Sequence, residues 1–492
     1  MLTALLIAPI LAALALVAGF GDRRLARYTA IAQLIAASVI TLTYDRAAGG
    51  FQFSTTSGPL FPGTDLAFSL GVDGLGVVML LLTSLVTVAA TWFIPEIGAR
   101  QNLLDASVLL ISAGCTGAFA SKDLFFFYAF HELALIPTFL SIGIWGSGER
   151  QSIAWKITIY LALGSIILLV GLLDLYLAGP EGMRTMDLGK LAELGRKGVI
   201  PATAQARPFL FLLTGFGILV SLVPFHSWAP SAYASAPAPV GMLHAGVLKK
   251  FGLYGLMRLA VPLLPEGASQ PVIGNWTGMD LLLLCIVGNV LYAGLATIGQ
   301  RKLDMLLGFS SVMHMGYVFL GIAAGNLIGL SGAAVLMFGH GLSIAILLAI
   351  NGLIREAEET TAIDRLGGLM KRAPSIGVLF AFATFASIGL PGFANFSGET
   401  LVFFGAFKAS GTSFIRGATF VGLWGVVISA VYMLRAYRNA FLGEAREGAR
   451  FASPGFLCHW PLILLTLSLL VVGVLPNSLL NLVKPTLQTL IR

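Results

Sequence analysis

The segment VSLVPFHSWAPSAYASAPAPVGMLHAGVLKKFGLYGLMR, from Val220 to Arg258, begins as an apolar helix and is then interrupted by four prolines. A second helical stretch follows, and it carries His244, Lys249 and Lys250. Proline removes a backbone donor and clashes with the preceding turn, so a membrane span broken in this way must be buried in protein or border a wet cavity. Because an ionisable side chain is costly in hydrocarbon, lysines beside a broken helix indicate an ion or proton path.

The composition places this segment in a membrane protein. Hydrophobic residues make up 57% of the 492 residues and charged residues 11%, and the mean hydropathy is +0.89. A soluble globular chain is far less apolar, so the sequence predicts a polytopic membrane protein. The net charge of +7 is spread over the loops without a basic block, which gives no indication of nucleic-acid binding.

The three cysteines, Cys115, Cys285 and Cys458, lie in apolar runs without CxxC or Cys/His spacing. This pattern indicates neither a disulfide framework nor a metal site, and we expect no redox centre or cofactor in this chain. The first apolar run, residues 2–20, lacks a basic flank and is long enough to cross a membrane. We therefore expect it to be the first transmembrane helix rather than a cleaved signal.

Hydropathy predicts an all-α polytopic fold with about 14 transmembrane helices. They are expected near residues 2–20, 27–44, 74–95, 103–120, 124–145, 153–178, 208–224 with its broken continuation to 238, 239–262, 278–299, 304–324, 328–354, 374–410 as a second broken element, 414–442 and 457–475. The lysine and arginine distribution among the loops favours both termini outside. The segment 184–207 is expected to contain a surface amphipathic helix.

The second interruption is SIGLPGFANFSGETLVFFGAF, from Ser387, where glycines and a proline break an apolar segment just before Glu399. Paired Pro/Gly breaks, one in each half of a chain, indicate an inverted-repeat transporter with its path at the repeat interface. We expect four regions: N-terminal helices (1–120), a first antiporter-like half (121–262), a second half (263–442), and a C-terminal transmembrane helix with its tail (443–492).

Several motifs together carry a resemblance to a known family. They are FYAFHELALIPTFLSIGIWG (127–146), PFHSWAPSAYASAP (224–237), GFSSVMHMGYVFLGI (308–322), HGLSIAILL (340–348), IDRLGGL (363–369) and LPGFANFSGE (390–399). In this order and spacing the chain resembles the antiporter-like membrane subunits of respiratory complex I, the M-type (NuoM-type) subunits above all. Membrane-bound hydrogenases and Mrp-type cation/proton antiporters use similar subunits.

The resemblance implies a proton path through buried side chains. Glu132 matches the proton-channel glutamate of the fifth helix, and Lys250 matches the relay lysine of the eighth. His340 matches a central-axis histidine, and Glu399 matches the glutamate near the exit.

Three more residues, His244, Lys249 and His314, are candidates because they lie in apolar helices and carry groups that can exchange protons. Each candidate has a structural alternative: a buried histidine or carboxylate is often only hydrogen-bonded, and a lysine near a membrane edge often only extends its ammonium to water.

Leu219 departs from the family pattern. M-type subunits carry a lysine there, paired with the fifth-helix glutamate, so Glu132 here lacks that partner. Either another cation replaces the lysine, with Lys249 as one candidate, or the channel works differently or not at all.

We therefore predict a proton-translocating membrane subunit of a complex I-like NADH:quinone oxidoreductase in a bacterial inner membrane. NADH, FMN, iron-sulfur clusters and quinone are expected in partner subunits. The expected partners are antiporter-like neighbours, a peripheral redox arm and lipids. The alternatives are an Mrp-type or stand-alone sodium/proton antiporter, a hydrogenase subunit, and a structural spacer with an inactive channel.

Overall fold

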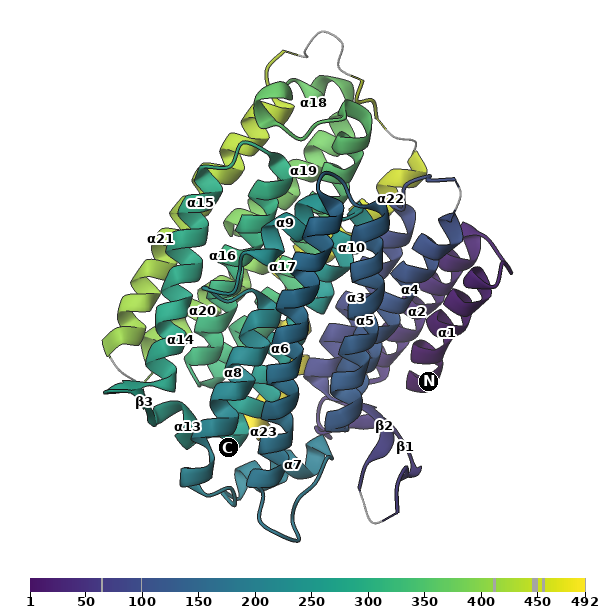
Figure 1. The fold of residues 1–492 in the computed structure, drawn as a ribbon. Coiled ribbons are helices and arrows are strands. Elements are labelled where there is room, and N and C mark those ends of the chain that lie inside the picture. The colour runs from purple at the N-terminus through teal and green to yellow at the C-terminus, as the bar shows by residue number, and fades with distance from the viewer. Residues whose placement is uncertain (63–64, 99, 410–412, 445–449, 454–455, 492) are drawn as a thin grey trace.

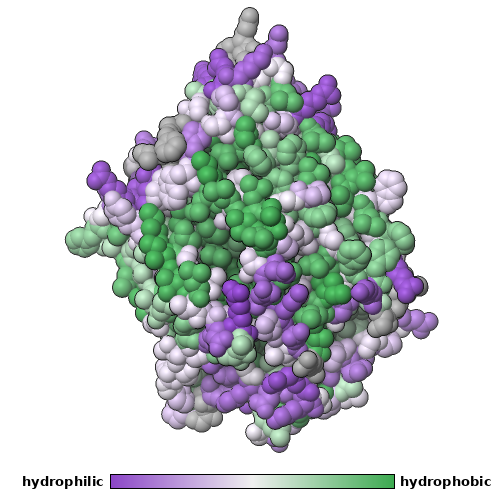
Figure 2. Space-filling view, turned by 180° about the vertical axis from the view of Figure 1, so that it is seen from behind, coloured by the Kyte–Doolittle hydropathy of each residue, from purple (hydrophilic) through white to green (hydrophobic). Residues whose placement is uncertain are grey.

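The structure is a computed structural model that describes residues 1–492 except 63–64, 99, 410–412, 445–449, 454–455 and 492. Upright helices form a bundle, and two small hairpins lie at one end of it (Figure 1). Figure 2 shows hydrophobic residues over the middle of one face and hydrophilic residues toward the ends. This distribution suits a chain that crosses a membrane. The side chain of Cys458, predicted to be unpaired, lies outside the described side chains.

The elements of the first half follow one another along the chain. They are α1 (Leu2–Val17), α2 (Arg23–Thr43), β1 (Gln52–Pro59), β2 (Ala67–Val72), α3 (Gly74–Trp92), α4 (Gln101–Ala120), α5 (Leu124–Trp145), α6 (Arg150–Ala178), α7 (Leu188–Arg196), α8 (Ala206–Val220), α9 (Trp228–Ser235), α10 (Ala238–Leu243), α11 (Lys250–Gly255) and α12 (Val261–Leu263).

The second half continues with the same mixture of long and interrupted helices. Its elements are α13 (Pro265–Ser269), β3 (Pro271–Ile273), β4 (Trp276–Thr277), α14 (Gly278–Val287), α15 (Gly294–Ile298), α16 (Leu303–Ala323), α17 (Leu327–Glu358), α18 (Leu369–Arg372), α19 (Pro374–Ile388), α20 (Ala394–Lys408), α21 (Ser413–Phe441), α22 (Phe456–Val474) and α23 (Asn477–Ile491).

The predicted transmembrane helices agree with this structure. Among the described residues, ten helices are long and apolar enough to cross a membrane singly. The remaining predicted crossings coincide with α1, the segmented helix from α10 to α12, the broken pair α19 and α20, and α22. The expected surface helix is α7. Helix α23 was not predicted from the sequence; it lies at 71° to α22 and packs along α3 and α17.

The two broken helices run in opposite directions. The α8 to α9 pair rises through the bundle in Figure 1, whereas the α19 to α20 pair descends. Ser221 ends α8 in a left-handed conformation (φ 70°), and Gly389 ends α19 in the same way (φ 81°). The breaks that the proline and glycine positions predicted are therefore present, and they have the inverted relation expected of the repeats.

Candidate functional site: a buried line of titratable side chains

The central helix, from α10 to α12, is not a regular α-helix. It contains two wider π-helical segments, His244–Leu248 and Leu256–Ala260, and the first of them leads directly into the two lysines. Lys249 and Lys250 are both fully buried. Because π-helical turns change the direction of the side chains that follow and often occur at functional sites, this segment aims the two ammonium groups differently from a regular helix.

Lys250 contacts a histidine from the other half of the chain. Its Nζ lies 3.0 Å from Nδ1 of His340 on α17 and donates to the carbonyl oxygen of Ala245 at 2.6 Å. The ring of His340 in turn lies 5.6 Å from that of His314 on α16. The structure thus brings three of the predicted path residues, Lys250, His340 and His314, together at the interface of the two repeats. We call these three residues the central line.

His314 bridges its own helix and the end of a broken one. Its Nδ1 lies 2.7 Å from the carbonyl oxygen of Ser310, and its Nε2 lies 2.8 Å from that of Ser387, in the last turn of α19. Carbonyl oxygens only accept hydrogen bonds, so both ring nitrogens of His314 face acceptors. His314 thus connects α16 to the end of the broken helix α19.

Lys249 and His244 face a different group of side chains. Lys249 Nζ lies 3.4 Å from the Ser311 hydroxyl on α16 and 5.6 Å from the centre of the Tyr233 ring. The Tyr233 hydroxyl lies 3.3 Å from Nδ1 of His244. Lys249 therefore contacts Ser311 and Tyr233 in this structure rather than Glu132.

Glu399 lies at the second break. Its side chain is buried, and its Oε1 has no hydrogen-bond partner within the described part of the chain. A Cβ at Gly389 would lie 2.2 Å from Glu399 Oε2, so only glycine leaves room for the carboxylate there. Glu399 and Thr400 help line a cavity of about 340 Å³ between α20 and α21.

Glu132 lies at a different flank, between α5 and α6. Its side chain is 35% exposed in the isolated chain and lines a cavity of about 170 Å³. The Ser165 hydroxyl donates to its carboxylate, and Nδ1 of His131 lies 3.4 Å from Oε1. Glu132 is thus partly exposed at one flank of the isolated chain rather than fully buried.

Two further features were not predicted from the sequence: His131 beside Glu132, and the ion pair between Asp73 and Arg258. Arg258 Nη2 donates to both carboxylate oxygens of Asp73 at 2.8 and 2.7 Å, and both side chains are buried. The guanidinium also lies over the rings of Phe51 and Tyr254. The sequence contains an indication of each feature. His131 directly precedes the candidate glutamate, and Asp73 is a charged residue within an apolar run.

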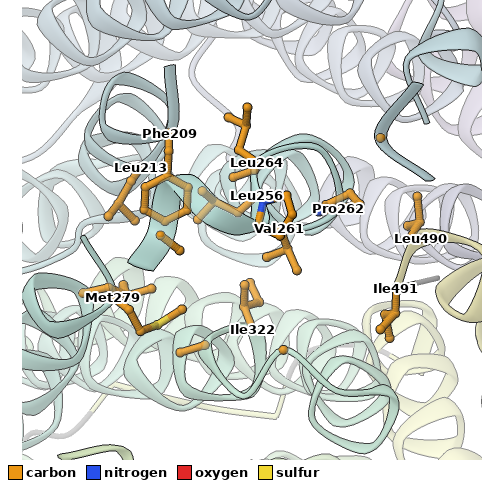
Figure 3. Close-up of a pocket in the computed structure, with 17 residues that line it drawn as sticks. Phe209, Leu213, Leu256, Val261, Pro262, Leu264, Met279, Ile322, Leu490 and Ile491 are labelled. Carbon is orange, nitrogen blue, oxygen red and sulfur yellow. The ribbon is translucent and has the colours of Figure 1, made fainter. Parts of the chain in front are cut away.

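A further cavity, lined almost entirely by apolar side chains, lies apart from these titratable residues. It has a volume of about 300 Å³ and is lined by side chains such as Phe209, Leu213 and Met279, with Leu490 near the C-terminus at its edge (Figure 3). The residues that line it carry no titratable side chain. It therefore offers no step for a proton.

Comparison with known proteins identifies the family. The family of NADH:quinone oxidoreductase/Mrp antiporter transmembrane proteins matches residues 121–425. The chain belongs to this family. The NAD(P)H-quinone oxidoreductase chain 4 2 of Thermosynechococcus vestitus is 35% identical over 412 residues, which cover 83% of this chain and 75% of the relative. The expected resemblance to the complex I subunits is confirmed.

Solved structures share the whole fold. A chain of respiratory complex I from Thermus thermophilus with bound NADH superposes with a TM-score of 0.87 at 27% identity, and all of both chains is covered. A chain of the Mrp complex from Dietzia sp. DQ12-45-1b superposes with a TM-score of 0.83 at 21% identity, covering 100% of this chain and 97% of that one. The likeness to the Mrp chain is one of fold alone.

Proposed function

We propose that this chain is a proton-translocating membrane subunit of a complex I-like NADH:quinone oxidoreductase in a bacterial inner membrane. The contact between Lys250 and His340 carries the proposal. It joins the two repeats through titratable side chains, and the central line that contains it is accompanied by one carboxylate from each half, Glu132 and Glu399. Nothing in a purely structural spacer requires such a line.

Protons move along the line because neighbouring sites cannot all be charged together. Two positive charges at 3.0 Å repel strongly in a buried site, so a proton that arrives at His340 favours release of one from Lys250. His314 and Glu399 continue the line on one side, and His244, Lys249 and Glu132 continue it on the other. Water molecules bridge neighbours that do not touch.

The redox chemistry belongs to partner subunits in this proposal. NADH, FMN, iron-sulfur clusters and quinone act there, and antiporter-like neighbours and lipids cover the exposed apolar flanks. Within the described part of the chain, no group of histidine, cysteine, aspartate and glutamate side chains could hold a metal ion. Both termini lie toward the hairpin end of the bundle in Figure 1, and we place that end outside the cytoplasm. The antiporter-like halves would be 121–262 and 263–442, between the N-terminal helices (1–120) and the C-terminal region (443–492).

The proposal is tested with Glu132→Gln in the assembled complex. Proton uptake per NADH oxidised is measured in inverted membrane vesicles, and NADH oxidation with an artificial acceptor confirms that the redox arm is attached. We expect Glu132→Gln to lose coupled proton uptake. Glu193→Gln is the matched control, because Glu193 is an exposed glutamate on the surface helix α7. Proton uptake by Glu132→Gln at the wild-type ratio would contradict the proposal.

A sodium/proton antiporter of the Mrp type is distinguished in the same vesicles. Proton uptake that requires NADH oxidation and proceeds without sodium supports the proposal. Exchange of sodium for protons without any electron donor supports the antiporter.

A further inference from the structure

Leu219 on α8 packs against α6 next to Ser165, the residue that donates to Glu132. It is buried, and its Cδ2 lies 3.2 Å from the position that a Cβ on Gly164 would occupy. The next residue, Ser165, donates its hydroxyl to Glu132. A basic side chain at position 219 would therefore point into the neighbourhood of the carboxylate, but this chain has an alkyl group there.

His131 supplies a basic group at the same carboxylate from a different helix. Its Nδ1 lies 3.4 Å from Glu132 Oε1, and its side chain is 2% exposed. The imidazole lies flat on the Phe251 ring, with 4.1 Å between the ring centres and 19° between the planes. This stack, together with burial, fixes the ring with one nitrogen toward Glu132.

The stack also directs His131 toward the central helix. Phe251 directly follows Lys250, and His244 lies seven residues earlier on the same helix, roughly 10 Å along its axis. His131 therefore packs directly on the helix that carries His244, Lys249 and Lys250. His131 thus lies between the flank carboxylate and the central line.

We propose that His131 replaces the absent lysine of α8 as the basic partner that exchanges a proton with Glu132. In one state Glu132 is a neutral carboxylic acid and Nδ1 of a neutral His131 accepts its hydrogen bond. In the other state the proton has moved to Nδ1, which leaves a carboxylate and an imidazolium. The imidazolium then releases the proton from Nε2 toward His244 through water. This inference rests on the proposed function, because it names the partner within the same path.

The test is a rescue by the lysine itself. His131→Phe removes the titratable group but keeps an aromatic ring to stack on Phe251, and we expect proton uptake per NADH oxidised to fall to the level of Glu132→Gln. The double variant His131→Phe with Leu219→Lys returns a basic group to the same carboxylate from α8. We expect the double variant to recover coupled uptake, with Leu219→Lys alone as its control.

The outcomes separate this inference from the proposed function. Loss in Glu132→Gln together with wild-type uptake in His131→Phe overturns the role of His131 and leaves the proton path intact. Loss in His131→Phe without recovery in the double variant assigns His131 to packing and also overturns the inference. Wild-type uptake in Glu132→Gln overturns the proposed function itself. Acceptor-linked NADH oxidation and the amount of this chain in the purified complex are measured for every variant, so that an assembly defect is not read as a loss of transfer.

Discussion

Replacing Lys250 with arginine is expected to block the central line while leaving the complex assembled. Arginine keeps a positive charge and can still donate to the carbonyl oxygen of Ala245, which Lys250 contacts at 2.6 Å. A guanidinium does not release its proton in a protein, whereas a buried lysine does. The substitution therefore removes the transfer step and retains the charge.

The size of the effect follows from the distance between Lys250 Nζ and His340 Nδ1, which is 3.0 Å. Two unit charges at that separation repel by about 5.5 kcal/mol at an effective dielectric constant near 20. A permanent charge there lowers the population of protonated His340 by roughly 10⁴-fold. In the wild type this repulsion drives the release of a proton from Lys250 when His340 is protonated. In Lys250→Arg the guanidinium keeps its proton, so the repulsion cannot be relieved in this way.

The measurement is proton uptake per NADH oxidised in proteoliposomes that contain the whole complex, followed with a pH-sensitive dye. Lys250→Arg should show little coupled uptake and normal NADH oxidation with an artificial acceptor. Lys190→Arg, on the exposed face of α7, is the matched control and should behave as the wild type. Proton uptake at the wild-type ratio in Lys250→Arg would refute the reasoning, because a side chain that cannot release its proton would then be sufficient for coupled proton uptake.

Three further predictions concern the elements that hold the line in place. Asp73→Asn keeps an N-cap for α3 but leaves a buried guanidinium unpaired, so the free energy of unfolding should fall by about 3–5 kcal/mol, measured by denaturant titration in detergent. Burial raises the pKa of Asp123, the N-cap of α5, to about 6, so its contribution to stability is complete below its unfolded pKa and is lost as the pH rises through 6. The melting temperature of the wild type relative to Asp123→Asn should therefore fall between pH 5 and pH 7.5, and a constant difference would contradict this. Gly389→Ala should displace the Glu399 carboxylate and reduce coupled proton uptake, whereas Gly392→Ala has a similar positive φ (97°) and open space around its Cβ, and should retain that uptake.

The sequence by itself determined the class of fold and the places where helices break. In a membrane every backbone donor and acceptor must be paired within the protein, so long apolar stretches become helices, and prolines and glycines inside them mark interruptions. The breaks near Pro224 and Gly389 were predictable for this reason. Glu132, Lys250 and Glu399 were also visible as ionisable groups in apolar segments.

Only the tertiary structure decided which of these groups meet. Lys250 and His340 are 90 residues apart in the sequence, and Asp73 and Arg258 are 185 apart, so their contacts depend on how distant helices pack. The π-helical turn at His244–Leu248 changes the direction of the next side chains, and Lys249 consequently faces Ser311 on α16 instead of Glu132. Sequence spacing assumes a regular helix and contains no information on helix rotation. That rotation is set by packing against helices far along the chain. For this reason only the structure shows that His131, stacked on Phe251, is the basic side chain beside Glu132.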